Sequence, residues 1–215
     1  MSDVLEKVRR ALGRTQRLTS VPPPPVIEEP IARLVHTEIG LSELFAKRAG
    51  ELKMQVEFVS PEEVAPSIVA FLREKNCSKI GLSESPILQS LGVVEAIRSA
   101  GIKAKTWDEL SLDEFYEYDC GITDADYAIA ETGTLAIFPR PGHGRGLSLL
   151  PLYHVCVLEP HKILPDLIDF FEKMGSAHRG QDAVLISGPS KTADIEMNVV
   201  TGVHGPNLVK TFILK

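Results

Sequence analysis

The sequence lacks several features that are typical of well-known protein classes. It contains three cysteines, Cys77, Cys120 and Cys156, which lie far apart and form no CxxC pair. They therefore offer no sequence-local ligand set for zinc or an iron–sulfur cluster, and no disulfide framework. The sequence also lacks an apolar signal-peptide core and an apolar run long enough to span a membrane. We therefore expect a cytoplasmic protein without a membrane span, whose cysteines are buried and unpaired.

Positive charge and nucleotide-binding motifs are lacking as well. The formal net charge is -6, which argues against a duplex nucleic acid partner, because binding the phosphate backbone needs an excess of Lys and Arg. The patterns G-x-x-x-x-G-K-[ST] and G-x-G-x-x-G, which place backbone amides around nucleotide phosphates, do not occur. We therefore expect no nucleotide cofactor, no other cofactor and no resident metal ion.

The chain does have enough apolar sequence for one substantial core. Of its 215 residues 44% are hydrophobic and 24% charged, which suits one domain with a small appendage. An apolar stripe predicts a helix over Ser2 to Leu12, and the run from Thr19 to Pro25 has polyproline character. That run is interpreted as a spacer in preference to a partner ligand. We expect residues 1–30 to form an N-terminal helical arm with its linker, and residues 31–215 to form the main α/β domain.

The main domain shows strand and helix patterns in alternation. Helices are predicted over 31–49, 61–75, 93–99 and 165–174, the second of them opened by the capping-box sequence Ser60-Pro61-Glu62-Glu63. Strands are predicted over 55–59, 79–82, 102–106, 120–123, 127–130, 135–138, 154–158, 183–186 and 208–214. The first half favours a parallel sheet with helices on both faces, and the closely spaced strands of the second half favour an inserted antiparallel element.

The loop after the strand at 183–186 is the first candidate site. Its sequence is Ser187-Gly188-Pro189-Ser190-Lys191-Thr192-Ala193-Asp194-Ile195-Glu196. We expect it to open a helical turn at the carboxyl edge of the sheet, where Gly188, Ser190, Lys191 and Thr192 would hold an anion. Asp194, Glu196 and the nearby His204 add acid–base capacity, although their spacing matches no known metal motif. The alternative is that Ser190 or Thr192 only caps a helix.

The turn Glu131-Thr132-Gly133-Thr134 is the second candidate site. A glutamate at the end of an apolar strand, beside a glycine and two hydroxyl groups, is a candidate nucleophile or base. The alternative is an ordinary β-turn whose threonines, Thr132 and Thr134, bond the backbone. Asp124 and Asp126, a few residues upstream, are interpreted as turn and capping residues.

The glycine-rich segment from Phe138 to Gly146 is the third candidate site. It contains two arginines and a histidine, and we expect a mobile loop in which Arg145 contacts a carboxylate or phosphate group. The alternative is an exposed loop whose arginines are solvated. His154 has no sequence context that suggests a role.

Together these motifs resemble those of the lactate utilization protein C family, the LUD-domain or YkgG-like proteins. The resemblance rests on Ala125-Asp126, Ala130 to Thr134, Ser148-Leu149-Leu150-Pro151 with His154, Ser187 to Glu196, and Gly202-Val203-His204-Gly205-Pro206, in that order. It implies a three-layer α/β/α fold with a mainly parallel sheet, similar to the sugar-isomerase and CoA-transferase (NagB/RpiA-like) group.

The resemblance also implies a function, the oxidation of L-lactate to pyruvate. In that system the chain would be a non-redox subunit beside iron–sulfur partner subunits. It would bind a small organic acid or phosphorylated ligand, with Arg145 and Lys191 as the candidate contacts. Glu131 and His204 are then the candidate catalytic residues. The alternatives are a CoA-transferase- or isomerase-like enzyme with Glu131 as nucleophile or base, and a small-anion binding protein.

Overall fold

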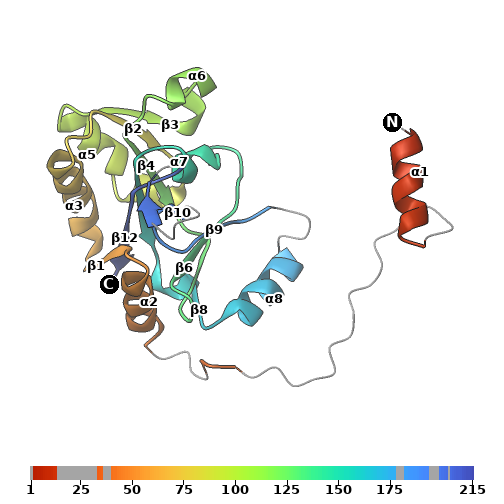
Figure 1. The fold of residues 1–215 in the computed structure, drawn as a ribbon. Coiled ribbons are helices and arrows are strands. Elements are labelled where there is room, and N and C mark those ends of the chain that lie inside the picture. Colours follow the sequence, from red (N-terminus) through yellow and green to blue (C-terminus); the bar gives the residue numbers. More distant parts are fainter. Residues whose placement is uncertain (1, 14–32, 36–39, 178–181, 194–198, 203) are drawn as a thin grey trace. The chain divides into compact units, whose positions relative to one another are not determined.

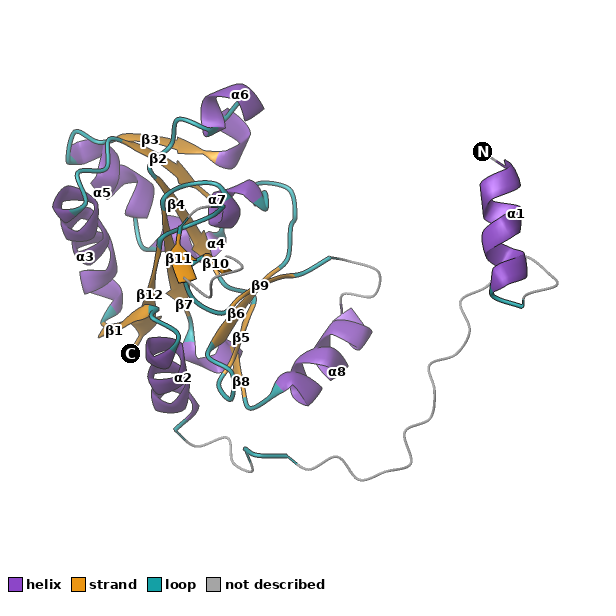
Figure 2. Ribbon diagram, viewed as in Figure 1, coloured by secondary structure: helices purple, strands orange, loops and turns teal. Residues whose placement is uncertain are grey.

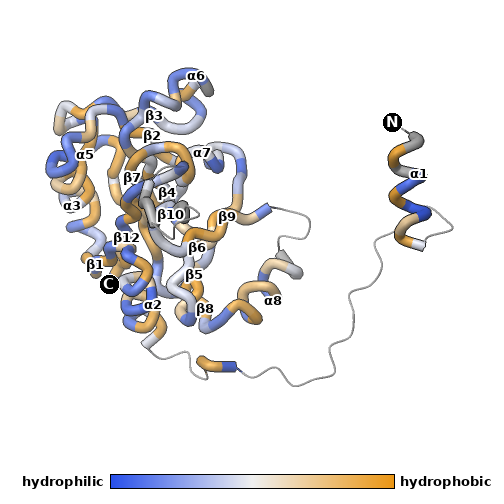
Figure 3. Tube along the Cα trace, in the orientation of Figure 1, coloured by the Kyte–Doolittle hydropathy of each residue, from blue (hydrophilic) through white to orange (hydrophobic). Residues whose placement is uncertain are grey.

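The computed structural model describes residues 2–13, 33–35, 40–177, 182–193, 199–202 and 204–215. The chain divides into two units, Met1–Ala32 and Arg33–Lys215. In the first unit, α1 (Ser2–Ala11) exposes the apolar residues Val4 and Val8, and Figure 3 shows hydrophobic and hydrophilic colours alternating along it. The predicted polyproline linker lies outside the described residues. Among the helices that are described, none has the length and apolar character needed to cross a membrane.

A six-stranded parallel sheet forms the centre of the second unit (Figure 1). In spatial order its strands are β1 (Gln55–Val59), β12 (Leu208–Leu214), β7 (Tyr153–Leu158), β4 (Cys120–Asp124), β2 (Lys79–Leu82) and β3 (Lys103–Thr106). Every neighbouring pair is parallel. The chain moves outward from β2 to β3 in one direction and from β4 through β7 to β12 in the other. The strand order therefore reverses between β2 and β4.

Both faces of this sheet are covered, as the apolar character of its strands requires. On one face α3 (Pro61–Glu74), α4 (Pro86–Ser90) and α5 (Val93–Ser99) bury Ile68, Leu88 and Ile97 against strand residues. On the other face, α2 (Leu41–Glu51) and a second, smaller sheet share a core with the strands. The three cysteines are buried in these two cores as single side chains.

The smaller sheet is the antiparallel element that the sequence predicts (Figure 2). Its strands, in order, are β8 (Ile163–Leu164), β5 (Tyr127–Ile129), β6 (Thr134–Ile137) and β9 (Val184–Ile186). The β5–β6 and β6–β9 pairs are antiparallel, and α8 (Leu167–Ala177) packs Phe170 on its outer side. The predicted α/β class with a mainly parallel sheet is thus confirmed.

The remaining elements are short, and the sequence patterns did not predict them. They are the 3-10 helices Trp107–Glu109 and Pro160–Lys162, the helices α6 (Leu112–Phe115) and α7 (Gly146–Leu149), and the hairpin of β10 (Lys191–Ala193) and β11 (Val199–Thr201). Segments of three to five residues are too short for a hydrophobic period to be recognised.

Two helix starts show how local chemistry fixes the boundaries. α3 begins at Pro61 as predicted, because the Glu63 carboxylate accepts bonds from the Ser60 amide and hydroxyl at 3.0 and 2.9 Å. The helix predicted over 31–49 is wrong at its start: α2 begins at Leu41, after Gly40 with a φ of 71°, and residues 31–32 and 36–39 lie outside the described residues.

Candidate functional site

The loop after β9 does not have the geometry that the sequence suggested. β9 belongs to the smaller sheet and runs antiparallel to β6, so the loop does not follow a strand of the parallel sheet. Lys191–Ala193 forms β10 and pairs with β11, which makes the expected helical turn wrong. The reason is that the hairpin takes up the backbone donors and acceptors that a helix start would leave free.

The loop nevertheless lines a cleft of about 240 Å³, here called the loop cleft. Its walls include Ser148, Leu149, Gly188, Ser190, His204 and Val209. The cleft therefore brings together three of the predicted site residues, Gly188, Ser190 and His204. The backbone amide and carbonyl of Ser190 are already used, since Ser190 N donates to Pro206 O and Gly202 N donates to Ser190 O, both at 2.8 Å. The polar side chains in the cleft wall include Ser148, Ser190 and His204, and the Ser148 hydroxyl donates to Arg145 O at 3.2 Å.

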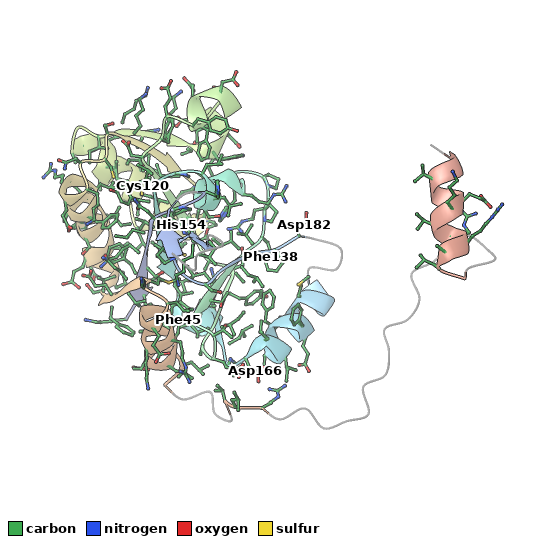
Figure 4. The ribbon with its side chains drawn as sticks, viewed as in Figure 1. Phe45, Cys120, Phe138, His154, Asp166 and Asp182 are labelled. Carbon is green, nitrogen blue, oxygen red and sulfur yellow. The ribbon has the colours of Figure 1, made fainter. Side chains whose placement is uncertain are left out.

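The two predicted cationic residues lie elsewhere. Lys191 Nζ donates to the carbonyl oxygen of Leu52, at the C-terminal end of α2, at 3.3 Å. Arg145 is exposed, and its guanidinium lies 3.6 Å from the exposed Asp182 carboxylate, which Figure 4 shows beside the end of the smaller sheet. Neither residue lines the loop cleft. Asp194 and Glu196 lie outside the described residues, and Thr192 is described only as part of β10.

The turn with Glu131 is joined to the loop by hydroxyl groups. Thr132 Oγ1 donates to Thr134 Oγ1, and Thr134 Oγ1 lies 2.8 Å from Ser187 Oγ. Gly133 has a φ of 61°, and a Cβ there would lie 2.4 Å from the Ala49 amide of α2, so this glycine permits close packing. Glu131 is half-buried, and its backbone amide donates to Pro165 O. The structure thus joins the turn to the loop through Thr134, whereas Glu131 bonds Pro165 and does not line the loop cleft.

A second group of charged residues lies at the carboxyl edge of the parallel sheet, and the sequence did not identify it. We call it the edge site; it consists of Asp124, Asp126, Arg140, His143, Glu159 and Lys162. Asp124 is the last residue of β4, and Glu159 directly follows β7, the parallel neighbour of β4. The edge site therefore lies where the strand order reverses, which is the usual ligand position in open α/β sheets.

Arg140 holds both aspartates of the edge site. Its Nη2 donates to the two carboxylate oxygens of Asp124 at 3.1 Å, and its Nη1 donates to both oxygens of Asp126 at 2.9 Å. Asp126 also accepts a bond from the Phe138 amide at 2.8 Å. Asp124 is 5% exposed. These residues were interpreted from the sequence as turn and capping residues, and the structure shows them in a buried ion-pair network instead.

The glycine-rich segment packs over the edge site, which corrects the expectation of a mobile exposed loop. Glu84 N donates to Gly142 O at 2.8 Å. A Cβ on Gly144 would overlap the Trp107 ring, and one on Gly142 would lie 2.9 Å from Glu84 Cβ. The glycines are therefore required by close packing. Their packing buries His143 to 1% exposure.

Two buried histidines stand beside the network. Burial lowers the pKa of His143 to about 4, with the nearby Arg140 cation acting in the same direction. Burial lowers the pKa of His154 to about 3, and its Nε2 lies 2.9 Å from Thr123 Oγ1. Figure 4 shows His154 within the core of the sheet. Both rings are therefore neutral at pH 7, and His143 has no hydrogen-bond partner on either nitrogen among the described residues.

Lys162 completes the edge site beside a cavity. Its ammonium lies 2.6 Å from Glu159 Oε2 and 3.9 Å from Asp124 Oδ2. The cavity, of about 350 Å³, is lined by Pro86, Ile87, Ser90, Asp124, Glu159 and Lys162. Within the described residues, no three His, Cys, Asp or Glu side chains are grouped as a metal site.

Comparison with known proteins adds the evolutionary context. The family model of the LUD domain matches residues 42–214. The chain is 28% identical to "Lactate utilization protein C" of Halalkalibacterium halodurans over 94% of this chain and 92% of that one. It is also 28% identical to "Uncharacterized protein YkgG" of Escherichia coli over 95% and 93%.

A solved structure shows a similar fold. The crystal structure of a DUF162 family protein from Deinococcus radiodurans matches with a TM-score of 0.63 at 22% identity, over 84% of this chain and 99% of that one. At this identity the similarity concerns the fold alone.

Proposed function

The chain belongs to the LUD domain family, and from this we propose that it serves in lactate utilization. The observation that carries the proposal is the match over nearly the whole length of both chains to a protein named for that process. The match extends over 94% of this chain and 92% of the relative, so it is not limited to one shared segment.

We propose further that the chain is a non-redox subunit that acts beside iron–sulfur partner subunits in the oxidation of L-lactate to pyruvate. The placement of its cysteines supports this. Cys77 and Cys120 lie in the core on one face of the parallel sheet and Cys156 in the core on the other. Burial raises the pKa of the Cys77 thiol to about 11 and that of Cys120 well above its ordinary value. Cluster ligation requires thiolates that converge on one point.

Exposed apolar side chains near the loop cleft also support the proposed association with partner subunits. Leu149 and Leu185 line the cleft and are 42% and 45% exposed, and Leu150 and Leu152 nearby in sequence are 49% and 52% exposed. Grouped exposed apolar side chains mark interaction surfaces more often than isolated ones do.

The loop cleft is the proposed binding site for a small organic acid such as L-lactate. The Ser190 hydroxyl and His204 would supply polar contacts to the carboxylate, and Leu149 and Val209 would supply apolar contact for a methyl group. The Ser148 hydroxyl donates to Arg145 O, so toward a ligand it could only accept a bond. The role of Glu131 as a nucleophile or base remains a prediction. It would need a substrate that extends from the cleft past Ser187 to the turn.

Two experiments test the proposal. A host strain without the gene should grow normally on glucose but poorly on L-lactate, and the full chain should restore growth. The tagged chain, purified from lactate-grown cells, should bring down subunits that contain iron and acid-labile sulfide. Normal growth of the deletion strain on L-lactate would contradict the role in lactate utilization. Restored growth without co-purifying iron would contradict only the partner assignment.

A further inference from the structure

The edge site has a feature that its structural role does not explain. Asp126 accepts three strong bonds, two from Arg140 and one from the Phe138 amide. Among the described residues, Asp124 accepts bonds only from Arg140, although it is more buried than Asp126. A carboxylate has about four acceptor positions. The buried Asp124 therefore keeps acceptor capacity, and it forms part of the wall of the 350 Å³ cavity.

Two polar groups lie close to Asp124 without forming a hydrogen bond to it among the described contacts. Lys162 Nζ lies 3.9 Å from Asp124 Oδ2, and His143 Nδ1 lies 3.4 Å from Asp124 Oδ1. His143 is 1% exposed and has no hydrogen-bond partner in the described part of the chain. An unsatisfied polar group that is this deeply buried is rare in folded proteins and calls for a reason. His143 Nδ1 faces Asp124 Oδ1 without forming a hydrogen bond, so this ring does not use the remaining acceptor capacity of Asp124.

The spacing between Lys162 and Asp124 selects the chemistry of the ligand. An ammonium group has three donors, and the described contacts of Lys162 place Glu159 on one side of it and Asp124 on the other. A ligand hydroxyl between Lys162 and Asp124 would accept a bond from the ammonium and donate one to the carboxylate. Neither a carboxylate nor an ammonium group does both, because the first only accepts and the second only donates.

The net charge of the edge site also favours a neutral ligand. Asp124, Asp126 and Glu159 carry three negative charges, Arg140 and Lys162 carry two positive ones, and His143 is neutral at pH 7. The sum of -1 disfavours an anion, and both cations are already paired with carboxylates. Pro86 and Ile87, which also line the cavity, offer an apolar surface of the kind that suits the C–H face of a sugar ring.

We propose that the edge site is a second ligand-binding site that takes a neutral polyhydroxylated molecule, a sugar or a polyol, with one hydroxyl held between Lys162 and Asp124. The site is separate from the loop cleft, and it does not depend on the function in lactate utilization. Its cavity lies at the point of strand-order reversal, and its size falls within the range of small-molecule pockets.

Binding can be followed in the full chain through its single tryptophan. Trp107 packs against Gly144, the residue next to His143, so a ligand at the edge site should change its fluorescence. The probes are D-ribose, D-glucose and myo-inositol, with L-lactate and inorganic phosphate as anionic comparisons, and saturation-transfer NMR provides a second readout. We expect at least one of the polyols to bind and neither anion to compete with it.

The variant Lys162→Met tests the hydroxyl contact, and Lys210→Met is its matched control. Lys210 forms a similar pair, with Glu57 at 2.6 Å, on the β1–β12 side of the sheet. We expect Lys162→Met to weaken polyol binding roughly 10-fold or more, as loss of a charged hydrogen bond does, and Lys210→Met to leave it unchanged. Ile87→Phe fills the cavity without removing a charge and should also abolish binding.

Three results would overturn the proposal. The ligand class is wrong if none of the three polyols binds, or if L-lactate or phosphate displaces a bound polyol from this site. The location is wrong if polyol binding survives both Lys162→Met and Ile87→Phe. Should Lys162→Met fail to fold, Ile87→Phe decides the location alone.

Discussion

The buried His154 makes stability depend strongly on pH, and this dependence can be worked out from the structure. Its folded-state pKa of about 3 lies well below the ordinary value of 6.5. Between these two values the unfolded chain binds a proton at this ring and the folded chain does not. Stability is therefore full above pH 6.5 and falls as the pH is lowered, by about 1.4 kcal/mol per pH unit for each such ring.

From pH 7 to pH 5 the expected loss is about 2 kcal/mol for His154 alone. His143, whose pKa is lowered to about 4 by burial and by the Arg140 cation, acts in the same direction over the same interval. The two rings together would remove roughly 4 kcal/mol, a large part of the 5–15 kcal/mol that is typical of a folded domain. Most carboxylates are still ionised at pH 5, so they contribute less in this interval.

Urea unfolding at pH 7, 6 and 5, followed by the fluorescence of Trp107, measures this slope. His154→Gln removes one titrating ring and keeps a group that can bond Thr123, so we expect the slope below pH 6.5 to fall by about 1.4 kcal/mol per unit. His161→Gln, at an exposed position, is the control and should keep the wild-type slope. An unchanged slope in His154→Gln, or His154 ring NMR signals that titrate above pH 5, would refute the reasoning.

Two further predictions concern packing and the loop cleft. Gly121→Ala should destabilise the fold by about 3 kcal/mol or more, because the added Cβ would overlap the carbonyl of Leu147. Gly50→Ala lies at an open position in α2 and should stabilise the fold by up to about 1 kcal/mol. Thermal unfolding of both variants measures this, and a similar melting temperature for the two would contradict it. In calorimetric titration with L-lactate, Ser190→Ala should weaken binding roughly 10-fold. Lys191→Met should leave binding unchanged, because the Lys191 ammonium bonds the end of α2. If Lys191→Met weakens binding and Ser190→Ala does not, the lysine and not the serine binds the anion.

The sequence predicted the long elements of the fold well because their patterns are strong. The capping box at Ser60 placed the start of α3 correctly, and the alternation of strands and helices indicated a parallel sheet with an antiparallel insert. The start of α2 was misplaced because apolar residues continue upstream of Gly40. The assignment of β9 to the parallel sheet was wrong because a short apolar run does not reveal its partner; only the pairing with β6 decides that.

The candidate sites were predicted less well than the fold, because their residues come from separate segments of the sequence. One wall of the loop cleft is a short continuous segment, so Gly188 and Ser190 could be recognised as one group, whereas Ser148 and Leu149 come from a distant part of the sequence. The edge site joins the end of β4, the segment after β6 and the segment after β7. Asp124 and Arg140 have no shared motif, and their proximity follows only from the strand order. The one available signal was that two carboxylates follow directly after a buried strand.

The asymmetry between Asp124 and Asp126 separates structural from functional parts of the edge site. Buried ion pairs add little net stability, since desolvation offsets most of their attraction. Asp126 nevertheless has a sufficient structural role, because it fixes the Phe138 amide and the Arg140 guanidinium in one position. The same guanidinium also bonds Asp124, which is 5% exposed and lines the cavity. A fold that needed only to fasten its loop would need Asp126 and Arg140, but not a second buried carboxylate facing a lysine across 3.9 Å.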